Sequence, residues 1–143
     1  MKKSILLVLS VMFCCSVMTA QNVKEIDVKK LPDMAHRTLS AYFQGQTVTQ
    51  AMYINEKMDR HYEVSLDDAT IIHFDKHGVW KLVKTGGNAI PDRMIPGMVL
   101  MHLQKNKIEA KVVGMMRDKD KNYTIDLSDG TTLTFTETFK LVE

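Results

Sequence analysis

The sequence predicts an α+β protein built from two tandem repeats, each with a helix and antiparallel strands. Three observations predict this class. Two prolines each precede an apolar pattern with helical spacing, alternating apolar and polar residues follow, and the same sequence blocks recur in the same order. Since one repeat cannot cover its own sheet well, we expect both helices on one face of a long sheet and the other face to stay open.

The first twenty residues have the features of a secretory signal peptide. Two lysines precede an apolar run, Ile5–Val17, and the segment ends at Ala20, a small residue at the expected cleavage position. The apolar run is too short to span a bilayer comfortably. We therefore expect residues 1–20 to be removed and the protein to be periplasmic or secreted, with no membrane association afterwards. An uncleaved anchor and a lipid-modified cysteine are the alternatives.

Removal of this segment changes the chemistry that the chain offers. Both cysteines, Cys14 and Cys15, lie within it, so the mature chain has no thiol for a disulfide, a nucleophile or a metal. Lys2 and Lys3 also leave, which reduces the 19 basic residues to 17 and matches the 17 acidic residues. A balanced charge without a basic run predicts no nucleic-acid partner.

An internal repeat organises residues 21–143, which are long enough for one core and are expected to form a single domain. The two copies span about residues 31–84 and 90–143 and share three blocks of similar sequence. The matched blocks are 31–33 with 90–92, 62–74 with 123–135, and 80–83 with 139–142. Each copy is expected to run helix, strand, hairpin, strand, and Gly86-Gly87-Asn88 is expected to link the copies.

Each copy opens with a helix signal. Pro32 suits a first helical turn, and apolar residues then recur at helical spacing up to Tyr42. The second copy begins with Pro91, but Pro96-Gly97 would interrupt a continuous helix. We therefore expect a turn there, followed by a helix from about 96 to 105.

A hairpin with a three-residue turn is expected in each copy. Residues that face each other across an antiparallel ladder share a face, so the inward residues Ile125 and Leu133 must pair. This pairing requires a three-residue turn that ends at Gly130 in the left-handed conformation. The first copy has Ala69 in the same place.

The same pairing in the first copy brings four polar side chains onto the outer face of the sheet. His61 faces Asp75, and Glu63 faces His73. Two imidazoles and two carboxylates in one patch suit zinc or another divalent cation. Opposite charges across a ladder are also ordinary solvated pairing, and the second copy has no equivalent set.

Apolar residues are expected on the same outer face if alternation continues along the first strand of each copy. Contiguous exposed apolar area is typical of a partner surface. The predicted partner-binding residues are Tyr53, His61, Glu63, Ile71, His73, Asp75, Val113 and Met115. A shift of one residue in the strand phase would place the apolar residues in the core instead.

The motifs of common enzyme classes are missing from the sequence. No serine after residue 20 lies in a G-x-S-x-G turn, and there is no H-E-x-x-H, P-loop or G-x-G-x-x-G motif. We therefore expect no catalytic activity and no cofactor. Glu63 with His73 in a pocket would be the pair for acid–base chemistry if the protein were an enzyme.

Several segments of the first copy occur in a distinctive order. They are Leu31-Pro32 before a short helix, Tyr62-Glu63-Val64, Ile72-His73-Phe74-Asp75 and Gly78-Val79-Trp80. This order resembles the secreted PepSY-like proteins grouped as beta-lactamase-inhibitor-like, over nearly all of residues 31–143. Ala69 departs from the family's usual glycine, and Pro96-Gly97 departs in the second helix. The resemblance implies tandem repeats, export, no known catalytic residues and an inhibitor-like or ligand-binding role through the sheet face.

These patterns predict a non-catalytic, exported binding module that holds a protein or peptide on its open sheet face. Inhibition of an envelope or secreted hydrolase is the sharpest form of this hypothesis. The alternative is an envelope stress protein that binds a divalent metal through His61, Glu63, His73 and Asp75.

Overall fold

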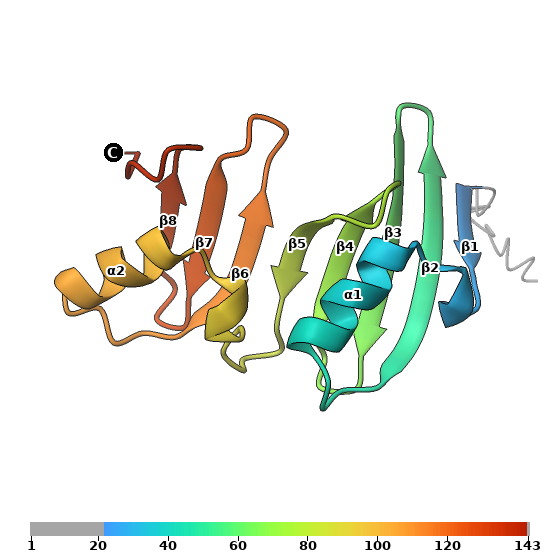
Figure 1. Ribbon diagram of the computed structural model, residues 1–143, viewed down its shortest axis with the longest axis horizontal. Coiled ribbons are helices and arrows are strands. Elements are labelled where there is room, and N and C mark those ends of the chain that lie inside the picture. The colour runs from blue at the N-terminus through green and yellow to red at the C-terminus, as the bar shows by residue number, and fades with distance from the viewer. Residues whose placement is uncertain (1–21, 143) are drawn as a thin grey trace, which may run out of the picture.

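The structure is a computed structural model that describes residues 22–142. The predicted signal peptide, residues 1–20, lies outside this range. Eight antiparallel strands form one sheet, in which each strand pairs with the next strand of the chain (Figure 1). The strands are β1 (Val23–Glu25), β2 (Val48–Glu56), β3 (Asp59–Leu66), β4 (Ile71–Asp75), β5 (Trp80–Lys84), β6 (Val112–Arg117), β7 (Tyr123–Leu127) and β8 (Thr132–Phe135).

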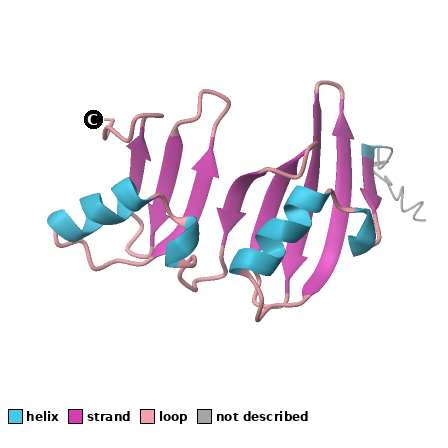
Figure 2. Cartoon of the chain, in the orientation of Figure 1, coloured by secondary structure: helices cyan, strands magenta, loops and turns pink. Residues whose placement is uncertain are grey.

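Two α-helices and two short 3₁₀ helices complete the described part of the chain. The helices are η2 (Val28–Lys30), α1 (Asp33–Tyr42), η3 (Asp92–Met94) and α2 (Gly97–Lys105). Figure 2 shows one α-helix in front of each half of the sheet. The fold is therefore α+β, as the sequence predicted. Of the helices within residues 22–142, none has the length and apolar character needed to cross a membrane.

Both α-helices begin directly after a proline. Pro32 and Pro96 occupy the N-cap positions, where the missing N–H breaks no helical hydrogen bond. The carbonyl of Pro96 accepts hydrogen bonds from the N–H groups of Val99 and Leu100, so Pro96 opens α2 instead of breaking it. The predicted turn and helix from about 96 to 105 are confirmed.

One hydrophobic core joins the helices to the sheet. Ala35 of α1 and Val99 and Leu103 of α2 belong to the same buried cluster as residues from β3 to β8. The sheet residues of this cluster include Val64, Leu66, Ile72, Phe74, Val83, Ile125, Leu127 and Phe135. Full burial of one such side chain contributes roughly 1.5–3 kcal/mol. We call the side of the sheet that carries these residues the helix face and the opposite side the outer face.

The two predicted hairpins have the predicted registers. Ile125 pairs with Leu133 in the second half, and Glu63 pairs with His73 in the first. In the second hairpin the N–H of Leu127 donates to the carbonyl of Thr131 at 2.8 Å, and in the first the N–H of Leu66 donates to the carbonyl of Thr70 at 2.8 Å. Three residues therefore lie in each turn, outside the ladder. Cross-strand parity was therefore a reliable guide in these hairpins.

The same backbone conformation closes both turns. Ala69 has a φ of 65° and Gly130 a φ of 87°, so both are left-handed. Asp68 and Asp129 each accept a hydrogen bond from the backbone N–H two residues later, at 3.0 and 2.9 Å. The backbone hydrogen bond from Thr131 lowers the pKa of the Asp129 carboxyl, because it stabilises the ionised form.

A β-bulge early in β2 and in β6 reverses the side-chain alternation. The register shifts between Val48 and Gln50 in β2 and between Val112 and Gly114 in β6. Each bulge inserts one residue, so positions that uninterrupted alternation places outward face inward beyond it.

Two residues predicted on the outer face lie on the helix face for this reason. Met115 pairs with Ile125 and is 1% exposed in the core, whereas the next residue, Met116, is 42% exposed. Tyr53 pairs with Tyr62, which shares its face with the buried residues of β3. The predicted outward placement of Met115 and Tyr53 is therefore wrong.

Val113 lies in the bulge of β6, at the junction of the two halves. Its carbonyl accepts hydrogen bonds from the N–H and the Oγ1 of Thr85, at 2.9 and 3.1 Å. The residue is half-buried, so it forms part of the junction and not of an open patch. The register pairs that join β5 to β6 are Leu82 with Met116, Val83 with Met115, and Lys84 with Gly114.

Candidate binding site on the outer face

Four predicted polar residues lie together on the outer face of β3 and β4. His61 is the register partner of Asp75, and Glu63 is the partner of His73. All four side chains are half-buried and alternate with the fully buried residues of the helix face. The sequence predicted both pairings and their common side.

An ion pair between His73 and Glu63 lies at the centre of this group. His73 Nε2 is 3.0 Å from Glu63 Oε2, and both side chains are about one-third exposed (32% and 31%). The ring of His61 stacks on that of His73, with centroids 5.6 Å apart and planes 22° apart. Because solvent screens the pair, it contributes less than about 1 kcal/mol to stability. Its main effect is to orient both side chains.

The imidazole of His61 has unused hydrogen-bonding capacity. Its Nδ1 lies 3.1 Å from Oδ2 of Asp59. The two groups are not aligned as a hydrogen bond, and Nδ1 has no hydrogen-bond partner within residues 22–142. Nδ1 has almost no exposed surface, so the Asp59 carboxylate is the polar group placed to interact with it.

Asp75 is engaged in the turn that follows β4. Its Oδ1 accepts hydrogen bonds from the N–H groups of His77 and Val79, at 2.9 and 3.0 Å. Its Oδ2 lies 3.8 Å from Nζ of Lys81. Gly78 in this turn has a φ of 84°, and a Cβ there would come within 2.8 Å of the backbone of α1. Asp75 therefore stabilises the loop that packs against α1.

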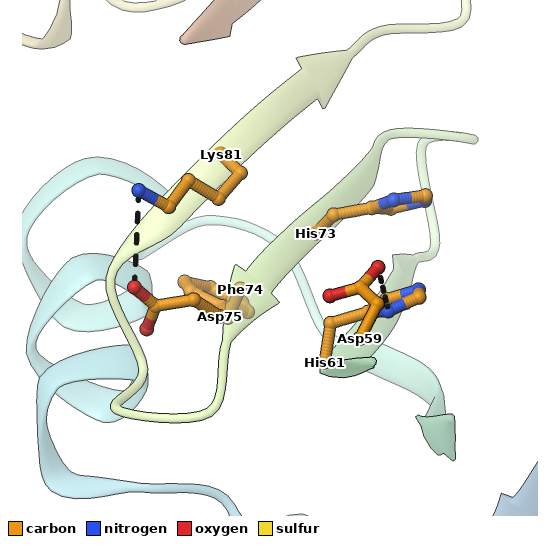
Figure 3. Close-up of a pocket in the computed structure, with 6 residues that line it drawn as sticks. All are labelled: Asp59, His61, His73, Phe74, Asp75 and Lys81. Carbon is orange, nitrogen blue, oxygen red and sulfur yellow. Dashed lines mark ion pairs between the residues drawn. The ribbon is translucent and has the colours of Figure 1, made fainter. Parts of the chain in front are cut away.

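A small pocket opens between the histidines and Asp75 (Figure 3). Its volume is about 210 Å³, and its lining residues are Asp59, His61, His73, Phe74, Asp75 and Lys81. Figure 3 shows His61 and His73 on one side and the Asp75–Lys81 pair on the other. The pocket is smaller than typical small-molecule sites, which are roughly 300–1,000 Å³. It suits one polar side chain of a larger partner.

Sequence reasoning missed three of the residues that line this pocket, Asp59, Phe74 and Lys81. Phe74 belongs to the buried core. Asp59 lies two positions before His61 on the same strand, so alternation alone could have found it. Lys81 could not be found in this way, because the register of β4 and β5 shifts between His73 and Phe74.

The four residues of the predicted metal set lie on one face, but they are not arranged to hold a metal ion. Within residues 22–142, no group of three or more His, Cys, Asp or Glu side chains is arranged to hold a metal ion. Glu63 is paired with His73, and Asp75 is held by backbone N–H groups of its turn. The divalent-metal hypothesis for His61, Glu63, His73 and Asp75 is therefore not supported by the geometry.

Apolar side chains on neighbouring strands surround the ion pair. They are Met52 and Ile54 of β2, Ile71 of β4 and Leu82 of β5, all half-buried. Ile71 was predicted here, whereas the other three were hidden by the bulge in β2 and by the register shift between β4 and β5. We call these four residues, together with His61, Glu63, His73 and Asp75, the outer patch.

Tyr53 lines a different cavity, on the helix face. Its ring centroid is 5.2 Å from that of Tyr62. The cavity has a volume of about 320 Å³ and is also lined by Lys24, Ile26 and Lys30. Tyr53 is therefore separated from the outer patch by the sheet itself.

Three solved structures with this fold come from two Bacteroides species. A "putative calcium-regulated periplasmic protein" from Bacteroides thetaiotaomicron matches with a TM-score of 0.82 and 29% identity, over 87% of this chain and 97% of that chain. A "putative periplasmic protein" from Bacteroides vulgatus matches with a TM-score of 0.81 and 27% identity, over the same shares. A "putative periplasmic protein of unknown function" from Bacteroides vulgatus matches with a TM-score of 0.78 and 22% identity, over 85% of this chain and 95% of that chain, which shows the fold alone.

The family comparison covers almost the whole chain. No curated protein matches. The family model described as "Putative beta-lactamase-inhibitor-like, PepSY-like" matches twice, over residues 17–71 and 60–143. The two matches overlap at residues 60–71 and are consistent with a tandem-repeat family, and their limits differ from those of the two sequence copies. The chain therefore belongs to the PepSY-like, beta-lactamase-inhibitor-like family.

Proposed function

We propose that the protein is an exported, non-catalytic binding module that holds a protein or peptide against the outer patch. One observation carries the proposal: the side of β2–β5 away from α1 combines four apolar side chains, an oriented ion pair and a pocket. Recognition surfaces typically combine an apolar area with a few polar groups in fixed positions. The partner would insert one polar side chain beside His61.

A more specific version of this proposal is that the bound partner is an envelope or secreted hydrolase and that binding inhibits it. Its support is the description of the family, which is beta-lactamase-inhibitor-like. A catalytic role for Glu63 and His73 has less support, because the pair lies on an open sheet face that does not exclude water from a reaction.

Export is supported by the N-terminal sequence and by the periplasmic neighbours. Mass spectrometry of protein recovered from the periplasm should find Gln21 at the N-terminus. Retention of Met1, or a lipid on Cys14 or Cys15, would contradict cleavage after Ala20.

Replacement of two apolar side chains tests the binding surface. An Ile71→Thr/Leu82→Thr variant removes apolar area from the outer patch with a residue that suits strands. Thr134→Ala is the matched control, because Thr134 is half-buried and pairs with Thr124 on the outer face of the second half. Cross-linking in cells, followed by mass spectrometry and titration of the purified partner, should detect binding by the parent and the control and a loss of at least tenfold for the double variant.

Equal binding by all three proteins, at equal melting temperatures, would exclude the outer patch as the binding surface. The titrations are run with calcium and with a chelator, since one structural neighbour is described as calcium-regulated. If the partner is a hydrolase, its residual activity with added protein decides whether binding inhibits it.

A further inference from the structure

The side of α2 away from the core carries three side chains of the types that soft metal ions prefer as ligands. Met98, Met101 and His102 occupy positions i, i+3 and i+4, which share one side of a helix with Cβ atoms about 5–6 Å apart. Met98 is 52% exposed and Met101 is 62% exposed, so neither thioether fills a gap in the core. Core packing therefore does not explain why Met98 and Met101 are methionines.

These side chains share a cavity with an aromatic wall. The cavity has a volume of about 270 Å³ and lies between α2 and the segment after β8. Its lining residues are Met98, Met101, His102, Lys105 and Phe139. The ring of Phe139 stacks on Tyr123 with centroids 5.4 Å apart, so that the wall is held in place.

The imidazole of His102 is positioned by the core. It meets the ring of Phe135 edge-on, with centroids 5.2 Å apart and planes 82° apart, and Phe135 is fully buried. Among the ion pairs of residues 22–142, none involves His102. Packing against Phe135 therefore limits the orientations of the His102 ring, and within residues 22–142 no hydrogen bond or ion pair engages its nitrogens.

We propose that Met98, Met101 and His102 bind a soft monovalent cation of the Cu(I) type in this cavity. Thioether sulfur favours Cu(I), and imidazole binds copper well, whereas hard cations such as calcium take oxygen ligands. Phe139 lines the cavity and would add attraction for a cation bound over its ring. The site is on the helix face and does not depend on the function proposed for the outer patch.

Lys105 is the one charged group in the cavity lining, and it opposes the cation. Its ammonium repels a positive ion, although a long exposed side chain can turn toward water. Removal of this charge should therefore raise the affinity for the cation, so the proposal predicts a variant that binds more tightly than the parent. A lysine at the rim of an unused surface would have no such effect.

Silver(I) is a suitable probe, because it has the charge and soft character of Cu(I) without its oxidation. For this titration both cysteines are replaced (Cys14→Ser/Cys15→Ser) so that no thiol competes for silver. The methionine methyl groups are labelled with carbon-13. Titration should shift the methyl signals of Met98 and Met101 and the ring signals of His102 until one ion is bound. Exposed methionines elsewhere, Met34, Met58 and Met116, should not shift. Equal shifts of all exposed methionines, or none, would overturn the proposal.

Variants separate ligation from general surface effects. Met98→Leu/Met101→Leu keeps apolar volume and should lower the silver affinity at least tenfold, whereas Met34→Leu/Met58→Leu should leave it unchanged. Lys105→Gln should raise the affinity, and excess calcium or zinc should not displace silver. Circular dichroism confirms that each variant is folded. Unchanged affinity in Met98→Leu/Met101→Leu would show that the thioethers are not ligands.

Discussion

The turn residue Ala69 holds a backbone conformation that costs an L-residue roughly 1–2 kcal/mol, and Gly130 holds the same position in the second hairpin. Ala69→Gly should therefore raise the free energy of unfolding by about 0.5–1 kcal/mol, since the added chain entropy of glycine offsets part of the gain. Gly130→Ala should lower it by about 1 kcal/mol. No atom lies within 4 Å of a Cβ at Gly130, so that loss would be one of backbone conformation alone.

Urea denaturation of both variants measures these changes directly. Opposite signs are the expected result, with unchanged m-values. If Ala69→Gly lowered stability, packing of the Ala69 methyl group would outweigh the relief of backbone strain.

The histidines of the outer patch should affect binding more than stability. His61 and His73 are partly exposed, each lies at ion-pair distance from one carboxylate, and their rings stack, so a His61→Ala/His73→Ala variant should lose less than about 2 kcal/mol. Its binding to the partner of the outer patch should fall at the same time. Thermal unfolding and titration check the two effects separately, and loss of folding would mean that these rings support the sheet.

The candidate site illustrates what cross-strand parity can and cannot predict. Parity placed His61 opposite Asp75 and Glu63 opposite His73, because a single three-residue turn fixes that ladder. It could not predict that Asp75 would turn to the backbone of its own loop, nor that Lys81 would reach it across a register shift. Such contacts depend on side-chain directions that residue alternation does not encode.

Among the elements, the bulges of β2 and β6 decide which side chains reach the core. The prolines that open the α-helices and the glycine of the second hairpin are strong local signals, so these elements could be predicted. A bulge has no such signature here, since Thr49 and Val113 are ordinary strand residues. The short strand β1 and η2 were also missed, because residues 22–30 mix charged and apolar residues without a clear period.

The bulge in β6 is tested by two neighbouring methionines. Met115→Ala should destabilise the protein by about 2–5 kcal/mol, because it leaves a cavity beside Ile125. Met116→Ala should change stability by no more than about 0.5 kcal/mol, because its side chain is exposed. Denaturant midpoints of the two variants give the comparison. The reverse order would place Met116 in the core and would remove the bulge from β6.

In the molecule as a whole, one buried cluster spans both halves although only β5 and β6 join them in the sheet. Trp80, the single tryptophan, contributes to this connection: it is half-buried, and its ring lies 6.5 Å from that of Tyr123 in β7. Since the core is continuous, both halves should unfold in one transition. Trp80 fluorescence and far-ultraviolet circular dichroism should therefore give the same denaturant midpoint. Separate midpoints would identify the β5–β6 junction as a boundary between independent folding units.

The order of the strands has a consequence for how the chain folds. Every strand from β2 onward pairs with the strand immediately before it, so each β ladder joins strands that are neighbours in the sequence. Such a topology keeps the relative contact order low for a β-rich protein, and loop closure costs little entropy at each step. A chain delivered N-terminus first can complete β1 to β5 with α1 before the second copy emerges, and the free edge of β5 then serves as the template on which β6 begins to pair.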